Sequence, residues 1–259
     1  MDKNQREARR RQEDQALNRG LMWVGGAIVL EFLLLLVNRY YITFKISEVG
    51  TAELIWNGLK LLRIAGVVLG VAALVWAGFR FRRGGKNGLC VVLALVCGAL
   101  ATCAHIILVF QKPGVQMLFL MVPAWAGLAL VYYLYQREFF LGAAASGMSV
   151  LGLWFVRYGG GVGLETVLTL VGILLVAAAT LWLKKNNGVI HRTNGEEVRF
   201  LSKKASYPMI LVSCLVGLVA LLAAMILGAN IAYYLMFAMV AWLFALLVYY
   251  TVKLMLKAE

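Results

Sequence analysis

The sequence predicts an all-α integral membrane protein with eight transmembrane helices. Three observations lead to this prediction: the overall hydrophobicity, the length of the apolar runs and the placement of the charges. Hydrophobic residues make up 63% of the 259 residues, and the mean hydropathy is +0.83. Globular domains contain about 45–50% apolar residues. The surplus of apolar side chains must therefore face lipid.

Eight apolar stretches follow one another along the chain, separated by short loops that hold most of the charge. A helix needs about 20 apolar residues to cross a hydrocarbon core of about 30 Å. Each stretch is continuous rather than alternating, and a helix satisfies its own backbone hydrogen bonds in lipid, so we expect helices rather than strands. The expected spans are residues 21–37, 59–79, 89–110, 115–135, 139–156, 162–183, 209–229 and 231–252.

The net charge of +13 reflects membrane topology rather than nucleic-acid binding. If the N-terminus lies in the cytoplasm, most of the 25 Lys and Arg residues fall in cytoplasmic loops, so the positive-inside rule places both termini there. These residues are expected to contact the anionic headgroups of the bilayer. The basic loops contain no aromatic or groove-reading motif, so no nucleic-acid partner is expected.

The N-terminal segment, residues 1–20, is polar and charged, and the apolar run after it has no small-residue cleavage site. The first span is therefore expected to remain as a signal anchor. We expect the protein to lie in a bacterial plasma membrane, with this basic segment on the cytoplasmic side.

A repeated pattern suggests two four-helix halves, residues 21–137 and 138–259. An Ala-Trp pair followed by Val-Tyr-Tyr within residues 124–133 recurs at the same spacing within residues 241–250, and residues 66–76 resemble residues 172–182. Because four is an even number, both halves would insert in the same orientation, related by an axis along the membrane normal. The alternative is chance similarity between helices that use a small set of apolar residues.

The loop at residues 188–201 predicts a short cytoplasmic β-hairpin. Asn194-Gly195 is the strongest two-residue turn signal, because a type I′ turn requires positive φ at both central residues. The flanking residues contain too few apolar side chains for an isolated hairpin to be stable. We therefore expect the hairpin, with the basic N-terminal segment, to rest on the helix ends or to bind a protein partner; the alternative is a solvated spacer.

Three polar side chains inside the spans are the candidate binding residues. A charge in hydrocarbon costs a few kcal/mol on insertion scales, so each is a functional candidate. Glu31 lies in the middle of the first span, Arg63 lies near the outer end of the second, and His105 lies outward of the middle of the third. Neighbouring antiparallel helices often pack side by side. A Glu31–Arg63 ion pair beside His105 would form a polar pocket for a headgroup, an ion or a proton, or would only fix helix order.

The sequence predicts no catalytic residue, no cofactor and no metal site. Hydrolytic chemistry needs paired carboxylates, a nucleophile with its base, or three to four metal ligands, whereas the spans contain no Asp and one His. The four cysteines lie within spans and lack metal-ligand spacing. The leading interpretation is a transporter-like protein or an accessory or scaffold subunit of a membrane complex. The alternative is a membrane-embedded enzyme that acts on a lipid or isoprenoid substrate.

Overall fold

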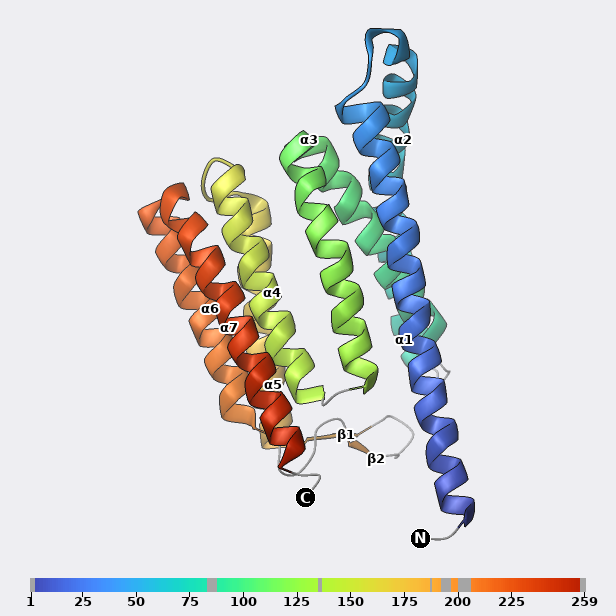
Figure 1. Cartoon of the computed structure of the whole chain (residues 1–259), viewed down its shortest axis with the longest axis vertical. Helices are drawn as coiled ribbons and strands as arrows, with labels where there is room; N and C mark the ends of the chain where they lie inside the picture. Colours follow the sequence, from blue (N-terminus) through green and yellow to red (C-terminus); the bar gives the residue numbers. More distant parts are fainter. Residues whose placement is uncertain are drawn as a thin grey trace. The chain divides into compact units, whose positions relative to one another are not determined.

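The structure is a computed structural model of the chain, and it describes residues 3–82, 88–134, 137–186, 188–191, 197–199 and 206–256. This part of the chain is almost entirely helical (Figure 1). Its elements are α1 (Lys3–Val37), η1 (Asn38–Ile42), η2 (Ile46–Glu48), α2 (Val49–Arg82), α3 (Gly88–Leu134), α4 (Arg137–Tyr158), α5 (Leu164–Lys185), β1 (Val189–His191), β2 (Glu197–Arg199), α6 (Tyr207–Leu227) and α7 (Ala229–Met255).

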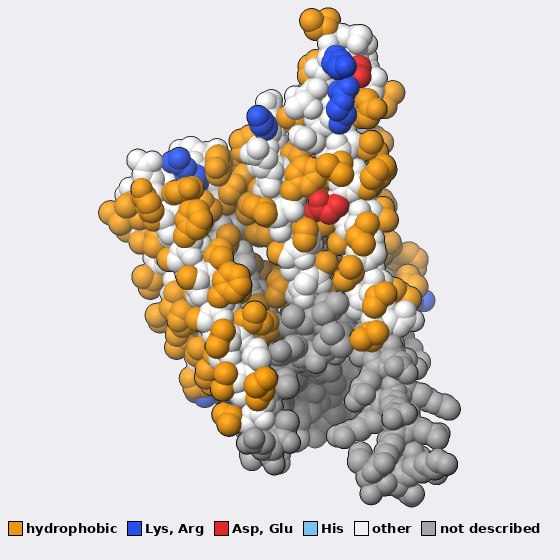
Figure 2. Space-filling model, in the orientation of Figure 1, with side chains coloured by type: hydrophobic (Ala, Val, Ile, Leu, Met, Phe, Trp, Pro, Cys, Tyr) orange, Lys and Arg blue, Asp and Glu red, His pale blue; other side chains and the backbone are white. Residues whose placement is uncertain are grey.

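Within the described ranges, 7 helices are long and apolar enough to cross a membrane. Hydrophobic side chains run along the helices on the face seen in Figure 2, and many large ones are more than half exposed, including Ile28, Leu61 and Leu175. Such a surface would be unfavourable in water. The chain is therefore a polytopic helical membrane protein.

The number of spanning helices is 7 rather than the expected eight because α3 covers two of the expected spans. α3 has 47 residues, and its backbone is non-helical at Gln111, where φ is 48° and ψ is −122°. Figure 1 shows the chain turning back near this point. Pro113 follows, and proline cannot donate the backbone hydrogen bond that continues a helix. A Cβ added to Gly114 would lie 2.6 Å from the carbonyl oxygen of Ile106, so only glycine fits this close approach.

The chain divides into two compact units. One unit comprises Met1–Trp23, Gly127–His191 and Glu197–Glu259, and the other comprises Val24–Ala126 and Arg192–Glu196. We call the four helices α4–α7 of the first the C-terminal bundle, and Val24–Ala126 of the second the N-terminal unit.

The core of the C-terminal bundle lies around α4, which packs against α5, α6 and α7. Small residues allow helices in a membrane to approach closely, and α4 is rich in them between Gly142 and Gly152. A Cβ added to Gly152 would lie 2.6 Å from Thr169 Oγ1 on α5. The core consists of fully or almost fully buried side chains, among them Leu153, Ile173, Ile210, Leu221, Met239 and Leu246.

In the N-terminal unit, α2 and α3 meet at a seam of small residues. A Cβ added to Gly66 would lie 2.9 Å from Cβ of Ala101 and 3.0 Å from the carbonyl oxygen of Cys97. The turn between α1 and α2 is closed by a bidentate ion pair, in which Arg39 donates to both carboxylate oxygens of Glu48 at 2.9 and 3.1 Å. Glu48 also accepts a hydrogen bond from the backbone N–H of Lys45.

Strands β1 and β2 pair antiparallel, with Ile190 opposite Val198 and His191 opposite Glu197. They lie in the loop for which a hairpin is expected. The turn residues, 192–196, fall outside the described residues. The cytoplasmic position of this loop stays a prediction.

Candidate functional site

The three candidate binding residues all lie in the N-terminal unit. Glu31 is on α1, Arg63 on α2 and His105 on α3, and each side chain is partly buried. No ion pair joins Glu31 to Arg63 in the part of the chain that the structure describes; its ion pairs include Arg39–Glu48 and Glu138–Lys253. The structure therefore places the three residues in one unit without forming the expected Glu31–Arg63 pair.

Glu31 lies between a buried position and an exposed flank of α1. Leu34, three residues further along, is buried, whereas Ile28 and Leu35 on the other flank are 65% and 55% exposed. The carboxyl atom Oε1 of Glu31 is buried, and no described residue donates a hydrogen bond to it. A buried polar atom without a partner is costly, and a carboxyl group in the middle of a membrane helix is more so.

Few residues are buried in the helix that carries Glu31, as is true of several other spans. In the most apolar stretch of the span Gly20–Ile42, 11% of the residues are buried; the share is 17% in the span Ala229–Lys253 of α7 and 67% in the span Glu138–Tyr158 of α4. α1 thus has the apolar length of a membrane helix, and its buried share among the described residues is close to that of α7.

A second charged cluster, which the sequence analysis missed, lies in the C-terminal bundle. Glu138 at the start of α4 is 3% exposed. It accepts hydrogen bonds from Lys253 Nζ near the end of α7, at 2.7 Å, and from the backbone N–H of Ser206 before α6, at 3.0 Å. Lys253 Nζ also donates to Ser206 Oγ at 2.7 Å. One carboxylate thus joins the ends of three helices.

Aromatic residues lie next to this cluster. The ring of Tyr250 packs against Phe139, with ring centroids 5.5 Å apart, and Lys253 Nζ lies 5.5 Å from the centroid of the Tyr250 ring. The hydroxyl groups of Tyr207 and Tyr250 are buried and find no hydrogen-bond partner in the described residues. With its carboxylate already paired and hydrogen-bonded, the cluster is suited to holding helix ends together.

A signal for this cluster exists in the sequence. Glu138 falls in the first turn of one apolar span and Lys253 in the last turn of another, where each charge also interacts favourably with its own helix dipole. Lys253 counts only among the basic residues of the positive-inside rule, which takes no account of Glu138. Their separation of 115 residues hides the pairing from any local pattern.

At the other end of the C-terminal bundle, Arg157 donates a hydrogen bond to Asn230 Oδ1 at 3.0 Å. Its guanidinium carbon also lies 5.8 Å from the centroid of the Tyr233 ring. In the N-terminal unit, Lys60 Nζ lies 3.2 Å from the ring centroid of Trp56. Basic and aromatic side chains of this kind favour the headgroup region of a bilayer, so we interpret both as interfacial anchors.

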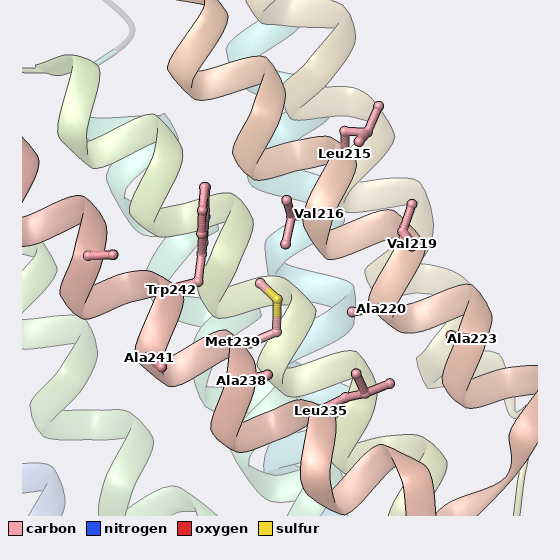
Figure 3. A pocket seen from close by; sticks show the side chains of 11 residues that line it. Leu215, Val216, Val219, Ala220, Ala223, Leu235, Ala238, Met239, Ala241 and Trp242 are labelled. Atoms are coloured by element: carbon pink, nitrogen blue, oxygen red, sulfur yellow. The ribbon is translucent and has the colours of Figure 1, made fainter.

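A groove with a volume of about 670 Å³ lies between α6 and α7 (Figure 3). Its lining is hydrophobic throughout, and alanines contribute much of it. Trp242 lies in the groove wall, and its indole N–H points to Ser213 Oγ at 3.4 Å. The lining residues are Leu215, Val216, Val219, Ala220, Ala223, Leu235, Ala238, Met239, Ala241, Trp242 and Ala245. Such a lining offers no charged group to orient a polar substrate.

The described residues include no group of three or more His, Cys, Asp or Glu side chains that could hold a metal ion. Comparisons of the chain with protein-family models, with curated proteins and with solved structures find no match. Glu31 on α1 is therefore the candidate functional residue, and the Glu138–Ser206–Lys253 cluster is the polar centre of the bundle.

Proposed function

We propose that this chain is an accessory or scaffold subunit of a membrane protein complex. The observation that carries the proposal is the Glu31 carboxyl group in the middle of a membrane helix, one oxygen of which has no hydrogen-bond donor among the described residues. In this proposal the C-terminal bundle is the stable anchor, and α1 binds another subunit laterally. The basic N-terminal segment and the loop at residues 188–201 form a cytoplasmic surface that also binds protein.

The proposed topology has eight crossings, in which the two arms of α3 cross the membrane separately. A straight helix of 47 residues would be about 70 Å long at 1.5 Å per residue, more than twice the hydrocarbon thickness of about 30 Å. Two arms joined at Gln111 each match one crossing. Both termini then lie in the cytoplasm of a bacterial cell, and the two four-helix halves have the same orientation.

A cysteine at Lys112 should react with a membrane-impermeant maleimide from outside the cell, whereas one at Lys86 should not.

A transporter is the second candidate, because Glu31, Arg63 and His105 are partly buried polar groups within one unit. They could bind a headgroup, an ion or a proton in the outer half of the membrane. Transporter sites commonly lie near the midplane, where polar groups face a cavity.

Two measurements on the full-length chain decide between these functions. Extraction from its native membrane in a mild detergent should yield a stoichiometric complex with another protein, seen as a larger mass by native mass spectrometry. Reconstitution of the chain alone into liposomes should give no solute flux above protein-free liposomes. A chain that purifies alone and supports a flux that is abolished by Glu31→Gln would overturn the scaffold proposal in favour of transport.

A further inference from the structure

We infer that Glu31 is a proton-binding site: its carboxyl group takes up a proton in the membrane, and this proton is the ligand that neutralises its charge. The inference goes beyond the proposed scaffold function, because it holds whether or not α1 binds another subunit. It rests on the depth of Glu31 in its span, on the burial of one carboxyl oxygen and on the distribution of cations along the chain.

Glu31 lies too deep in its span for the carboxyl group to reach water at either surface. It is eleven positions from each end of the span Gly20–Ile42, which is about 16 Å of helix at 1.5 Å per residue. A glutamate side chain is much shorter than this distance. The atom Oε1 is buried, and no described residue donates a hydrogen bond to it. An ionised carboxylate at this position would therefore be poorly compensated, and such a charge is costly in hydrocarbon.

The N-terminal unit supplies no ion pair that would compensate the charge. Glu31 is the only charged residue between Arg19 and Arg39. Two cations, Lys60 and Arg63, lie within the span of α2. Neither forms an ion pair with Glu31 in the described part of the chain.

The other titratable side chains of the helices in this unit are an imidazole, thiols and phenols. None of them forms an ion pair with Glu31 among the described residues. They are His105, Cys90, Cys97 and Cys103 on α3 and Tyr40 and Tyr41 in η1. The thiols and phenols carry no positive charge in either protonation state, so they cannot neutralise a carboxylate.

The C-terminal bundle holds no cation that could take this role. No Lys, Arg or His occurs in the apolar stretches of its four helices, residues 139–156, 164–183, 209–229 and 231–252. Its cations lie at or beyond the helix ends, and two of them, Arg157 and Lys253, are bound to Asn230 and Glu138. The bundle therefore has no basic side chain at the depth of Glu31.

A proton is the cation that a single carboxyl group can bind. Ca²⁺ takes about 6–8 oxygen ligands, and Mg²⁺ demands near-octahedral coordination. The described residues include no group of three or more His, Cys, Asp or Glu side chains that could hold a metal ion. Protonation needs no further ligand, because it converts the carboxylate to a neutral acid whose burial in hydrocarbon costs far less than that of the charged form.

Labelling with a hydrophobic carbodiimide tests the inference in the native membrane. Carbodiimides add to protonated carboxyl groups, and a hydrophobic one reaches those within the bilayer. Dicyclohexylcarbodiimide should modify Glu31 at neutral pH, and the adduct should decrease at alkaline pH and be lost in Glu31→Gln. A water-soluble carbodiimide should leave Glu31 unmodified. Peptide mass spectrometry locates the adduct, and Glu53→Gln, at an exposed position of α2, is the matched control that should leave it unchanged.

Infrared spectroscopy of the purified full-length chain gives a second measurement that does not depend on access of the reagent. A protonated carboxyl group has a C=O stretching band that is separate from the bands of a carboxylate. At neutral pH the wild-type chain should show this band, Glu31→Gln should lose the Glu31 contribution and Glu53→Gln should retain it. Absence of a Glu31 contribution at neutral pH would show an ionised carboxylate and overturn the inference, whatever the result of the labelling.

The outcomes separate this inference from the proposed function. If a stoichiometric partner co-purifies and the Glu31 band is absent, the inference fails and the scaffold function stands. If the band is present and the chain purifies without a partner, the scaffold function fails and the inference stands.

Discussion

The Glu138–Lys253 ion pair shows how one interaction between distant residues can hold a helical bundle together. Its two side chains are 4% and 18% exposed, and Ser206 donates and accepts hydrogen bonds within the same cluster. Replacing a well-buried pair by apolar residues can be neutral, but removing one partner leaves a buried charge without compensation. The cluster therefore contributes more to the order of the helices than to net stability.

Lys253→Ala should lower the free energy of unfolding by about 3 kcal/mol, because it removes the ammonium group that forms an ion pair with the buried Glu138 carboxylate. The double variant Glu138→Gln with Lys253→Leu should regain most of the loss, since a neutral amide oxygen can still accept the hydrogen bond from Ser206. Unfolding in detergent micelles, followed by helical circular dichroism, gives the measurement. Lys184→Ala, at an exposed site on α5, is the control and should change stability by less than about 0.5 kcal/mol. Equal losses in the single and double variants would contradict this account.

At the residue scale, the sequence indicated Glu31 but not Glu138. A carboxylate in the middle of an apolar run stands out without any knowledge of the fold, because its desolvation cost depends only on depth. A charge at the end of a span does not stand out in the sequence. The same residue can face water, cap its own helix, or be buried against the end of another helix. Only the packing of α4, α6 and α7 distinguishes these states for Glu138.

At the element scale, the apolar runs predict the membrane helices well, but the helix ends depend on other forces. The run at residues 139–156 corresponds to α4, Arg137–Tyr158, and the run at residues 209–229 corresponds to α6, Tyr207–Leu227. α1 begins at Lys3, far ahead of residue 21, where the first expected span begins, because a polar segment can continue a helix that lipid has already stabilised. Two expected spans fall within the single element α3, and the backbone departs from helical geometry between them at Gln111. Hydropathy carries no information about the backbone conformation of one residue.

Gly114→Ala should destabilise the turn of α3, because the new Cβ would lie 2.6 Å from a backbone oxygen of Ile106 that cannot move independently. Overpacking of this kind costs about 1–3 kcal/mol, so the unfolding midpoint should fall. Gly98→Ala is the matched control on the same helix, since a Cβ there meets nothing within 4 Å and alanine has the better helix propensity. Thermal unfolding of both variants in the same detergent gives the comparison. A stable Gly114→Ala protein would show that the two arms of α3 do not approach as closely as the structure indicates.

At the scale of the whole molecule, composition and charge placement predicted the class of the protein, and burial distinguishes its units. The core of the C-terminal bundle is made from side chains of α4–α7, with Leu128 of α3 at its edge. No comparable pattern in the sequence separates these helices from α1, because a side chain that faces lipid and one that faces a neighbouring helix are equally apolar. The partner surface of a membrane protein is therefore hard to predict from hydropathy alone.

The distribution of burial predicts that the C-terminal bundle folds without the N-terminal unit. A fragment of residues 137–259 keeps the Glu138–Lys253 pair and nearly all of the apolar core of α4–α7, so it should insert into membranes and unfold cooperatively at a midpoint close to that of the bundle in the full chain. A fragment of residues 1–136 contains α1, in whose span few residues are buried, and should be degraded or aggregate when it is expressed alone. Expression of each fragment, followed by size-exclusion chromatography and thermal unfolding, measures both outcomes. A C-terminal fragment that aggregates on its own, but is rescued by the N-terminal fragment, would show that the two units depend on each other for stability.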